Sequence, residues 1–130
     1  MTTRDNHRLP SVETYRNALS TLSLSPKHRL LLATHFLAHK HTITASHLAK
    51  LDGYKNYRGI NLQYGKLGKR IGDALGASYR PPNGAQASYS MATFIKPDED
   101  HPDWEWKMHG PLAEAVRELT WHRGITRPTP

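Results

Sequence analysis

The fold of this chain is decided by residues 42–76, which read TITASHLAKLDGYKNYRGINLQYGKLGKRIGDALG. This stretch predicts a short helix with Thr44 as its N-cap and Gly53 as its left-handed closing residue. A longer helix is then predicted from about Tyr57 to Leu75, followed by a stop at glycine. A short helix, a tight turn and a longer basic helix are the order of a helix-turn-helix.

Further elements are predicted on both sides of this stretch. Ser11 and Ser25 are N-cap signals for two earlier helices, and the second is followed by proline at the first helical position. Residues 89–96 and 104–108 are rich in strand-forming side chains and predict a hairpin with an acidic tip. A last helix is predicted to start at residues 110–111, Gly-Pro, with apolar residues at core spacing.

The predicted fold class is α+β and mainly α, a winged helix-turn-helix with additional N- and C-terminal helices. The domain covers residues 11–121, with a hairpin wing at about 89–108 and a short third strand at Ile43. Residues 1–10 are expected to be a flexible arm and residues 122–130 a flexible tail.

Composition limits the class of protein. The chain has 130 residues, one domain's worth, and no cysteine, which excludes a disulfide scaffold, a thiol nucleophile and a Cys-ligated zinc site. No apolar run approaches the ~20 residues of a membrane span, and the polar start lacks the apolar stretch of a signal peptide. We therefore expect a cytoplasmic protein with no membrane partner. The net charge of +7 makes polyanions natural partners.

The charges are segregated along the chain. Residues 26–80 carry ten basic and two acidic side chains, a net charge of +8. Residues 97–121 carry seven acidic and two basic side chains, a net charge of −5. A cationic middle fits contact with an anion, whereas the alternative is a merely solvated helix surface.

The helix predicted over residues 57–75 has distinct faces. At ~100° per residue its core face is Tyr57, Ile60, Tyr64, Leu67, Ile71, Ala74 and Leu75. A stripe of Gly65, Gly68 and Gly72 runs beside that face, although each glycine costs a helix ~1 kcal/mol relative to alanine. The stripe predicts close approach, either of another packed element or of a phosphate backbone.

The remaining side of this helix supplies the candidate DNA contacts. Amides read adenine and arginine reads guanine in the major groove, and the first turn of a recognition helix lies deepest there. Lysine and arginine also contact phosphates. The base-reading candidates are Asn56, Arg58, Asn61 and Gln63, and the phosphate-contacting candidates are Lys55, Lys66, Lys69 and Arg70. For each of these residues a solvated surface position is the alternative.

Two segments carry a resemblance to a known family: GYKNYRGINLQYGKLGKRIG at 53–72 and WEWKM followed by LAEAVRELTW at 104–121. Across residues 10–121 the chain resembles a bacterial winged-helix module. That module is found alone and in front of the HNH nuclease domain of McrA-type, modification-dependent restriction endonucleases. The matching positions are Tyr54, Asn56, Tyr57, Asn61, Tyr64, Gly65, Leu67, Gly68, Trp104 and Trp106.

The resemblance implies recognition of modified DNA, with N6-methyladenine as the best candidate. A methyl group on an exocyclic amine is read by aromatic surface beside a polar group. The candidate modified-base surface is Tyr57, Tyr64, Trp104 and Trp106, and the alternative places most of these rings in the core. Because the two tryptophans share one strand face, we expect both to point inward or both to be available.

No catalytic or metal site is predicted. No HNH segment follows Trp121, and no cysteine pair exists for that fold's zinc. His35 and His39, at i and i+4, are a candidate metal pair that lacks a third ligand at an obvious spacing. The acidic tip likewise lacks ordered calcium-ligand spacing. We therefore expect no enzyme activity, cofactor or metal.

The expected partner is double-stranded DNA, with a separate nuclease or defence-system protein as a further candidate. The alternative function is a protein-interaction adaptor or inhibitor that has a winged-helix shape and does not bind DNA. The oligomeric state stays open.

Overall fold

In a computed structural model that describes residues 9–100 and 102–123, the chain is an α+β protein and mainly helical. The described residues form five α-helices and one three-stranded antiparallel sheet. The helices are α1 (Val12–Thr21), α2 (Pro26–Leu37), α3 (Ala45–Leu51), α4 (Tyr57–Leu75) and α5 (Gly110–Leu119). The strands are β1 (Thr42–Thr44), β2 (Ala92–Ile95) and β3 (Glu105–Met108), and the 3₁₀ turns are η1 (His39–His41), η2 (Gly76–Ser78) and η3 (Ala87–Ser90).

Helix starts and ends follow the predicted local signals. Ser11, Ser25 and Thr44 each accept a hydrogen bond from the backbone N–H three residues later, so the predicted N-caps are confirmed. Gly53 has a φ of 83°, the left-handed conformation predicted for it. Residues 1–8 of the predicted arm and 124–130 of the predicted tail lie outside the described residues. None of the described helices is long and apolar enough to cross a membrane.

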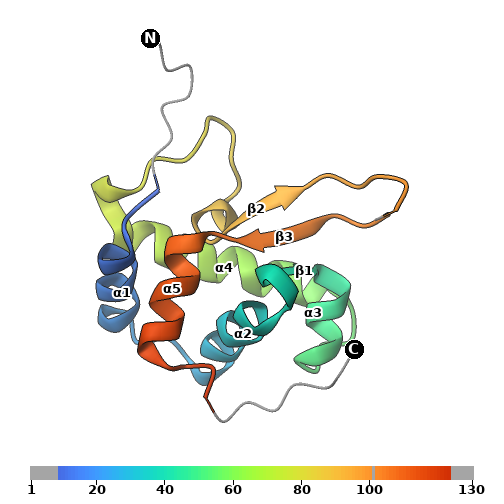
Figure 1. The fold of residues 1–130 in the computed structure, drawn as a ribbon, viewed down its shortest axis with the longest axis horizontal. Helices are drawn as coiled ribbons and strands as arrows, with labels where there is room; N and C mark the ends of the chain where they lie inside the picture. Colours follow the sequence, from blue (N-terminus) through green and yellow to red (C-terminus); the bar gives the residue numbers. More distant parts are fainter. Residues whose placement is uncertain (1–8, 101, 124–130) are drawn as a thin grey trace.

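The sheet has the order β1-β3-β2, with β3 in the middle. In this register Trp106 of β3 lies opposite Ile43 of β1 on one side and Phe94 of β2 on the other, so the predicted third strand at Ile43 is confirmed. Figure 1 shows the β2–β3 hairpin projecting well beyond the helical body. Its outer end is therefore free of cover by the helices.

The first hairpin strand is shorter than predicted, because residues 87–90 of the chain form the turn η3 instead of extending β2. Tertiary hydrogen bonds hold this turn. The Ser90 hydroxyl donates to the Gly68 carbonyl at 2.8 Å, and the Tyr15 hydroxyl donates to the Ser90 carbonyl at 2.7 Å. These contacts come from elements distant in sequence, and strand propensity alone does not predict them.

The core lies between the helices and the inner face of the sheet. Helix α4 contributes Ile60, Tyr64, Leu67, Ile71 and Leu75, all of them buried. Two further residues of the predicted core face, Tyr57 and Ala74, are exposed, so the prediction is wrong for these two positions. Both lie in a terminal turn of the helix.

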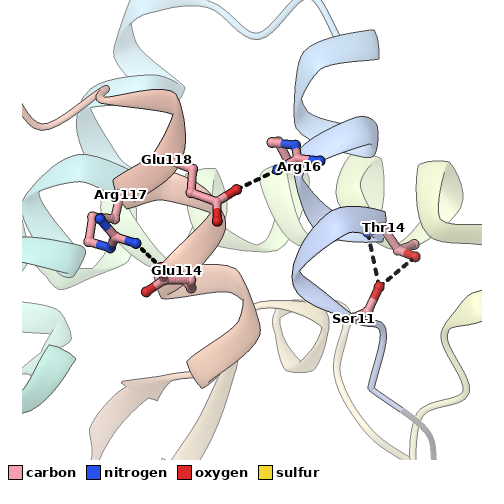
Figure 2. Close-up of polar contacts among 6 residues, drawn as sticks. All are labelled: Ser11, Thr14, Arg16, Glu114, Arg117 and Glu118. Atoms are coloured by element: carbon pink, nitrogen blue, oxygen red, sulfur yellow. Dashed lines mark hydrogen bonds and ion pairs between the residues drawn. The ribbon is translucent and has the colours of Figure 1, made fainter.

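Helices α1 and α5 pack side by side, as Figure 2 shows. Arg16 of α1 bonds Glu118 of α5, with 2.5 Å between Nη1 and Oε1, and Arg117 pairs with Glu114 within α5. Both pairs are exposed to solvent and therefore add little to stability. The helix pair is therefore held mainly by its buried apolar side chains.

The turn between α3 and α4 contains a partly buried carboxylate. Asp52 accepts a hydrogen bond from the Thr34 hydroxyl at 2.8 Å, but its other oxygen, Oδ2, is buried without a partner among the described residues. Burial raises the pKa of Asp52 from 3.8 to about 6. The folded protein therefore binds a proton on the Asp52 carboxyl more tightly than the unfolded chain does. Loss of that proton lowers the free energy of unfolding as the pH rises through 6.

Replacing Asp52 by asparagine is expected to stabilise the protein at neutral pH. Asparagine keeps an acceptor for Thr34 and removes the ionised group, and we expect a gain of about 1 kcal/mol after allowance for its partial exposure. Urea unfolding at pH 7 measures the change. The control is Asp73→Asn, an exposed carboxylate, which should stay within about 0.5 kcal/mol of wild type. Equal stability of both variants would contradict the prediction.

Candidate nucleic-acid interface

Helix α4 presents basic side chains on the side opposite its buried face. We call Arg58, Lys66, Lys69 and Arg70 the cationic flank, and all four are exposed. Lys69 lies 3.3 Å from Asp73, an ion pair so exposed that it neutralises little of the flank's field. Leu62 is also exposed within the flank. One side of a helix five turns long is therefore available for a partner.

The glycine stripe of α4 serves mainly the fold. A Cβ on Gly68 would lie 2.6 Å from the Ala87 carbonyl oxygen and 2.7 Å from Ser88 Cα, so this glycine lets α4 and η3 touch. A Cβ on Gly72 would meet Tyr79 at an ordinary 3.6 Å. At Gly65 a Cβ would meet nothing within 4 Å among the described residues. Of the two predicted uses, packing applies to Gly68.

Two of the predicted base-reading residues are engaged within the protein. Asn56 is the N-cap of α4 and accepts a hydrogen bond from the Arg58 N–H at 2.9 Å. Gln63 is half-buried, and its Oε1 lies 3.0 Å from His28 Nε2 on α2. Arg58 and Asn61 are exposed and lack such ties in the described structure. They are therefore the predicted readers that remain accessible, with the exposed Lys55 just before the helix.

A cavity of about 650 Å³ opens between α4, the start of α3, η3 and the hairpin. We call it the aromatic pocket. Its aromatic lining is Tyr57 and Tyr64 from α4, Phe94 from β2, and Trp104 and Trp106 from the second half of the hairpin. All four side chains of the predicted modified-base surface thus line one cavity. Its polar lining includes Asn61, Asp103 and Gln86.

The pocket has a buried floor and an exposed rim. The rings of Tyr64 and Trp106 stack with centroids 4.4 Å apart, and these residues are 1% and 7% exposed. Tyr57 and Trp104 are 49% and 54% exposed. The expectation that both tryptophans would be equally buried or equally available is therefore wrong. Trp106 of β3 packs on Tyr64 of α4, whereas Trp104, one residue before β3, keeps half of its surface exposed at the pocket rim.

A buried histidine fixes the pocket floor. His35 of α2 is fully buried, its Nε2 lies 2.9 Å from the Trp106 carbonyl oxygen, and its Nδ1 bonds the Tyr64 hydroxyl. Because a carbonyl only accepts, Nε2 carries the proton and Tyr64 donates to Nδ1. Burial lowers the pKa of His35 to about 4, which keeps the ring neutral.

The structure separates the two histidines of the i, i+4 pair. The ring of His35 faces Tyr64 and Trp106 in the core, whereas His39 is exposed in η1. Among the residues that the structure describes, no group of three or more His, Asp or Glu side chains could hold a metal ion.

Sequence reasoning missed part of the pocket. Phe94 faces Trp106 across the hairpin, and a register counted back from the acidic tip would have placed it there. Asp103 belongs to the acidic tip in sequence and also lines the pocket. The wall formed by Ala87 and Ser88 carries no local signal, since its position depends on the contact with α4.

Comparisons of the chain with protein-family models, with curated proteins and with solved structures find no match. The function is therefore inferred from the geometry and charge of this site.

Proposed function

We propose that this chain is a winged-helix protein that binds double-stranded DNA, with α4 in the major groove and the β2–β3 hairpin as the wing beside it. One observation carries the proposal. The cationic flank is exposed along a helix whose opposite side is buried in the core. An α-helix fits the major groove, and lysine and arginine supply the phosphate contacts that dominate DNA affinity.

The exposed residues divide into two roles along α4. Arg58 and Asn61 lie in the first turns, which enter deepest into the groove and contact base edges. Lys66, Lys69 and Arg70 lie farther along and contact phosphates, which sets the register without reading sequence. The proposed role is binding, and any cleavage of the DNA is assigned to a separate protein.

The aromatic pocket supports the finer proposal that the DNA carries a modified base, with N6-methyladenine as the candidate. The exposed rings of Tyr57 and Trp104 offer apolar surface for a methyl group. Asn61 lies in the same cavity and supplies an amide that pairs with adenine. A methyl contact and an adenine contact are thus available side by side.

Replacing Lys66 and Lys69 by alanine is expected to weaken binding to every DNA sequence by roughly tenfold to a hundredfold. Losing two phosphate contacts should also lower the slope of log affinity against log salt by about 2. Fluorescence anisotropy of a labelled duplex between ~50 and ~200 mM salt measures both quantities. The matched control replaces two exposed arginines by alanine, Arg29 over the ring of Trp121 and Arg123 two residues after it. This control should leave the slope of log affinity against log salt unchanged.

Replacing Asn61 by alanine tests base reading separately. This variant should retain general affinity and lose discrimination between sites by roughly tenfold, because only the base-edge contact is removed. Matched duplexes with and without N6-methyladenine test the modified-base proposal in the same assay. Equal affinity for the two would remove that finer proposal. Unchanged DNA binding in the Lys66/Lys69 variant would contradict the DNA proposal and favour a protein-interaction role.

A further inference from the structure

We propose that the aromatic pocket takes a single amine-bearing nucleobase that has rotated out of the DNA duplex. This inference rests on the proposed function and adds how the base reaches its site. It is carried by the cavity of about 650 Å³, by its buried floor of stacked rings, and by the cations on the adjoining side of α4.

The depth of the pocket distinguishes this mode from reading in the groove. A base that stays paired presents only its edge to a helix in the groove, and that edge meets exposed side chains such as Tyr57 and Trp104. The stacked floor of Tyr64 and Trp106 is buried beneath this rim. A planar base must leave its own stack to reach the cavity, where aromatic walls replace the stacking that it gives up. The cavity volume lies in the range of pockets that enclose small ligands.

The charges place the DNA backbone beside the pocket mouth. Arg58 directly follows Tyr57, and Lys69 lies four residues after Gly65, so both cations are on the side of α4 next to the pocket-lining residues. A phosphate held by Lys69 would position a nucleotide at the mouth. Asp103, in contrast, lines the cavity and repels phosphate. The backbone therefore stays outside and only the base enters.

The polar lining selects the class of base. A carboxylate such as Asp103 only accepts hydrogen bonds, so it favours a base whose pairing edge carries an amino group. Adenine, cytosine and guanine have that group, and thymine does not. Asn61 both donates and accepts, and therefore complements the ring nitrogen beside the amino group.

Gly65 provides a variant that closes the pocket without removing any polar group or charge. It lines the cavity, and a Cβ placed on it meets nothing within 4 Å among the described residues. In Gly65→Leu the side chain takes up part of the cavity and obstructs entry of a base, and leucine is a better helix former than glycine. A second variant, Trp104→Ala, removes one exposed wall of the pocket and leaves the buried core intact.

The experiment compares four labelled duplexes that differ at one base-pair position: a paired adenine, an adenine opposite cytosine, a thymine opposite thymine, and an abasic site opposite thymine. Anisotropy at ~150 mM salt gives the affinities. Rotating out a mismatched base costs less than breaking a pair, so the mismatched adenine should bind more tightly. We expect it to exceed the abasic and thymine duplexes by roughly five- to a hundredfold. Gly65→Leu should lose this preference and keep wild-type affinity for the paired duplex, and Trp104→Ala should lose the preference as well.

The outcomes separate this inference from the proposed function. Equal affinity of the wild type for the adenine mismatch and the abasic duplex would overturn base capture while DNA binding stood. A preference for mismatched adenine that persists in Gly65→Leu, with the fold verified by circular dichroism, would overturn the assignment to this pocket. Failure of the wild type to bind any of the duplexes would overturn the proposed function itself, and base capture with it.

Discussion

Replacing Gly68 by alanine is expected to lower the free energy of unfolding by about 3 kcal/mol, although alanine is the better helix former. The added Cβ would lie within 2.8 Å of three backbone atoms of Ala87 and Ser88, and backbone cannot rotate aside as a side chain can. Separating α4 from η3 would also break the hydrogen bond from Ser90 to the Gly68 carbonyl. Overpacking and the lost bond together outweigh the ~1 kcal/mol of helix propensity.

The matched control is the same substitution one turn earlier, at Gly65. A Cβ there has open space within the described structure, so Gly65→Ala should gain about 1 kcal/mol. Urea unfolding of both variants measures the two free energies. Because the chemical change and the helix are the same, the opposite signs report only the contact with η3. Two variants with equal stability would show that η3 moves away from α4 at little cost.

Acidification from neutral pH to about pH 4 is expected to remove roughly 3 kcal/mol of stability through His35. Burial lowers the pKa of this histidine from 6.5 to about 4 in the folded protein. Below pH 6.5 the His35 side chain therefore binds a proton in the unfolded chain, whereas in the folded protein it stays neutral until the pH approaches 4. The stabilising contribution is complete above 6.5 and is lost as the pH falls toward 4.

His35→Gln isolates this effect, because glutamine can donate to the Trp106 carbonyl and accept from Tyr64 without titrating. Its unfolding free energy should depend on pH less steeply than that of wild type between pH 6.5 and 4. The control is His47→Gln, an exposed histidine on α3, which should keep the wild-type slope. A wild-type slope in both variants would exclude His35 as the source.

The same histidine links stability to the proposed site. Through Tyr64 and Trp106, His35 ties α2 to both sides of the pocket floor. The floor rings are therefore held in place before any ligand arrives, which lowers the entropic cost of binding. We expect the rim, formed by the more exposed Tyr57 and Trp104, to be the part that adjusts.

Local signals predict the helices of this protein well. Helix-terminating signals act within one turn of their own position, so they can be predicted from the sequence. The examples here are the N-caps Ser11, Ser25 and Thr44 and the left-handed Gly53. The strand predicted from residue 89 is the main error in the fold. There, a hydrogen bond from Tyr15 to Ser90 and another from Ser90 to Gly68, both across long stretches of chain, override the local preference for extended backbone.

The candidate site is predictable in its residue types and not in its arrangement. Helical periodicity separates the cationic flank of α4 from its buried face. Periodicity also places Trp104 and Trp106 on one strand face, but it cannot say where the body beneath that strand ends. The extent of the packed body beneath the strand decides that Trp106 forms part of the buried floor and that Trp104 forms part of the exposed rim.

By itself, then, the sequence determined the helix boundaries and the side of α4 that carries positive charge, because both depend on interactions within a few residues. Only the tertiary structure decided that the aromatic rings enclose a cavity, that His35 is neutral at its base and that Gly68 must remain glycine. Each of these depends on elements far apart in the chain meeting at van der Waals or hydrogen-bond distance. Packing sets such distances, and no local pattern encodes them.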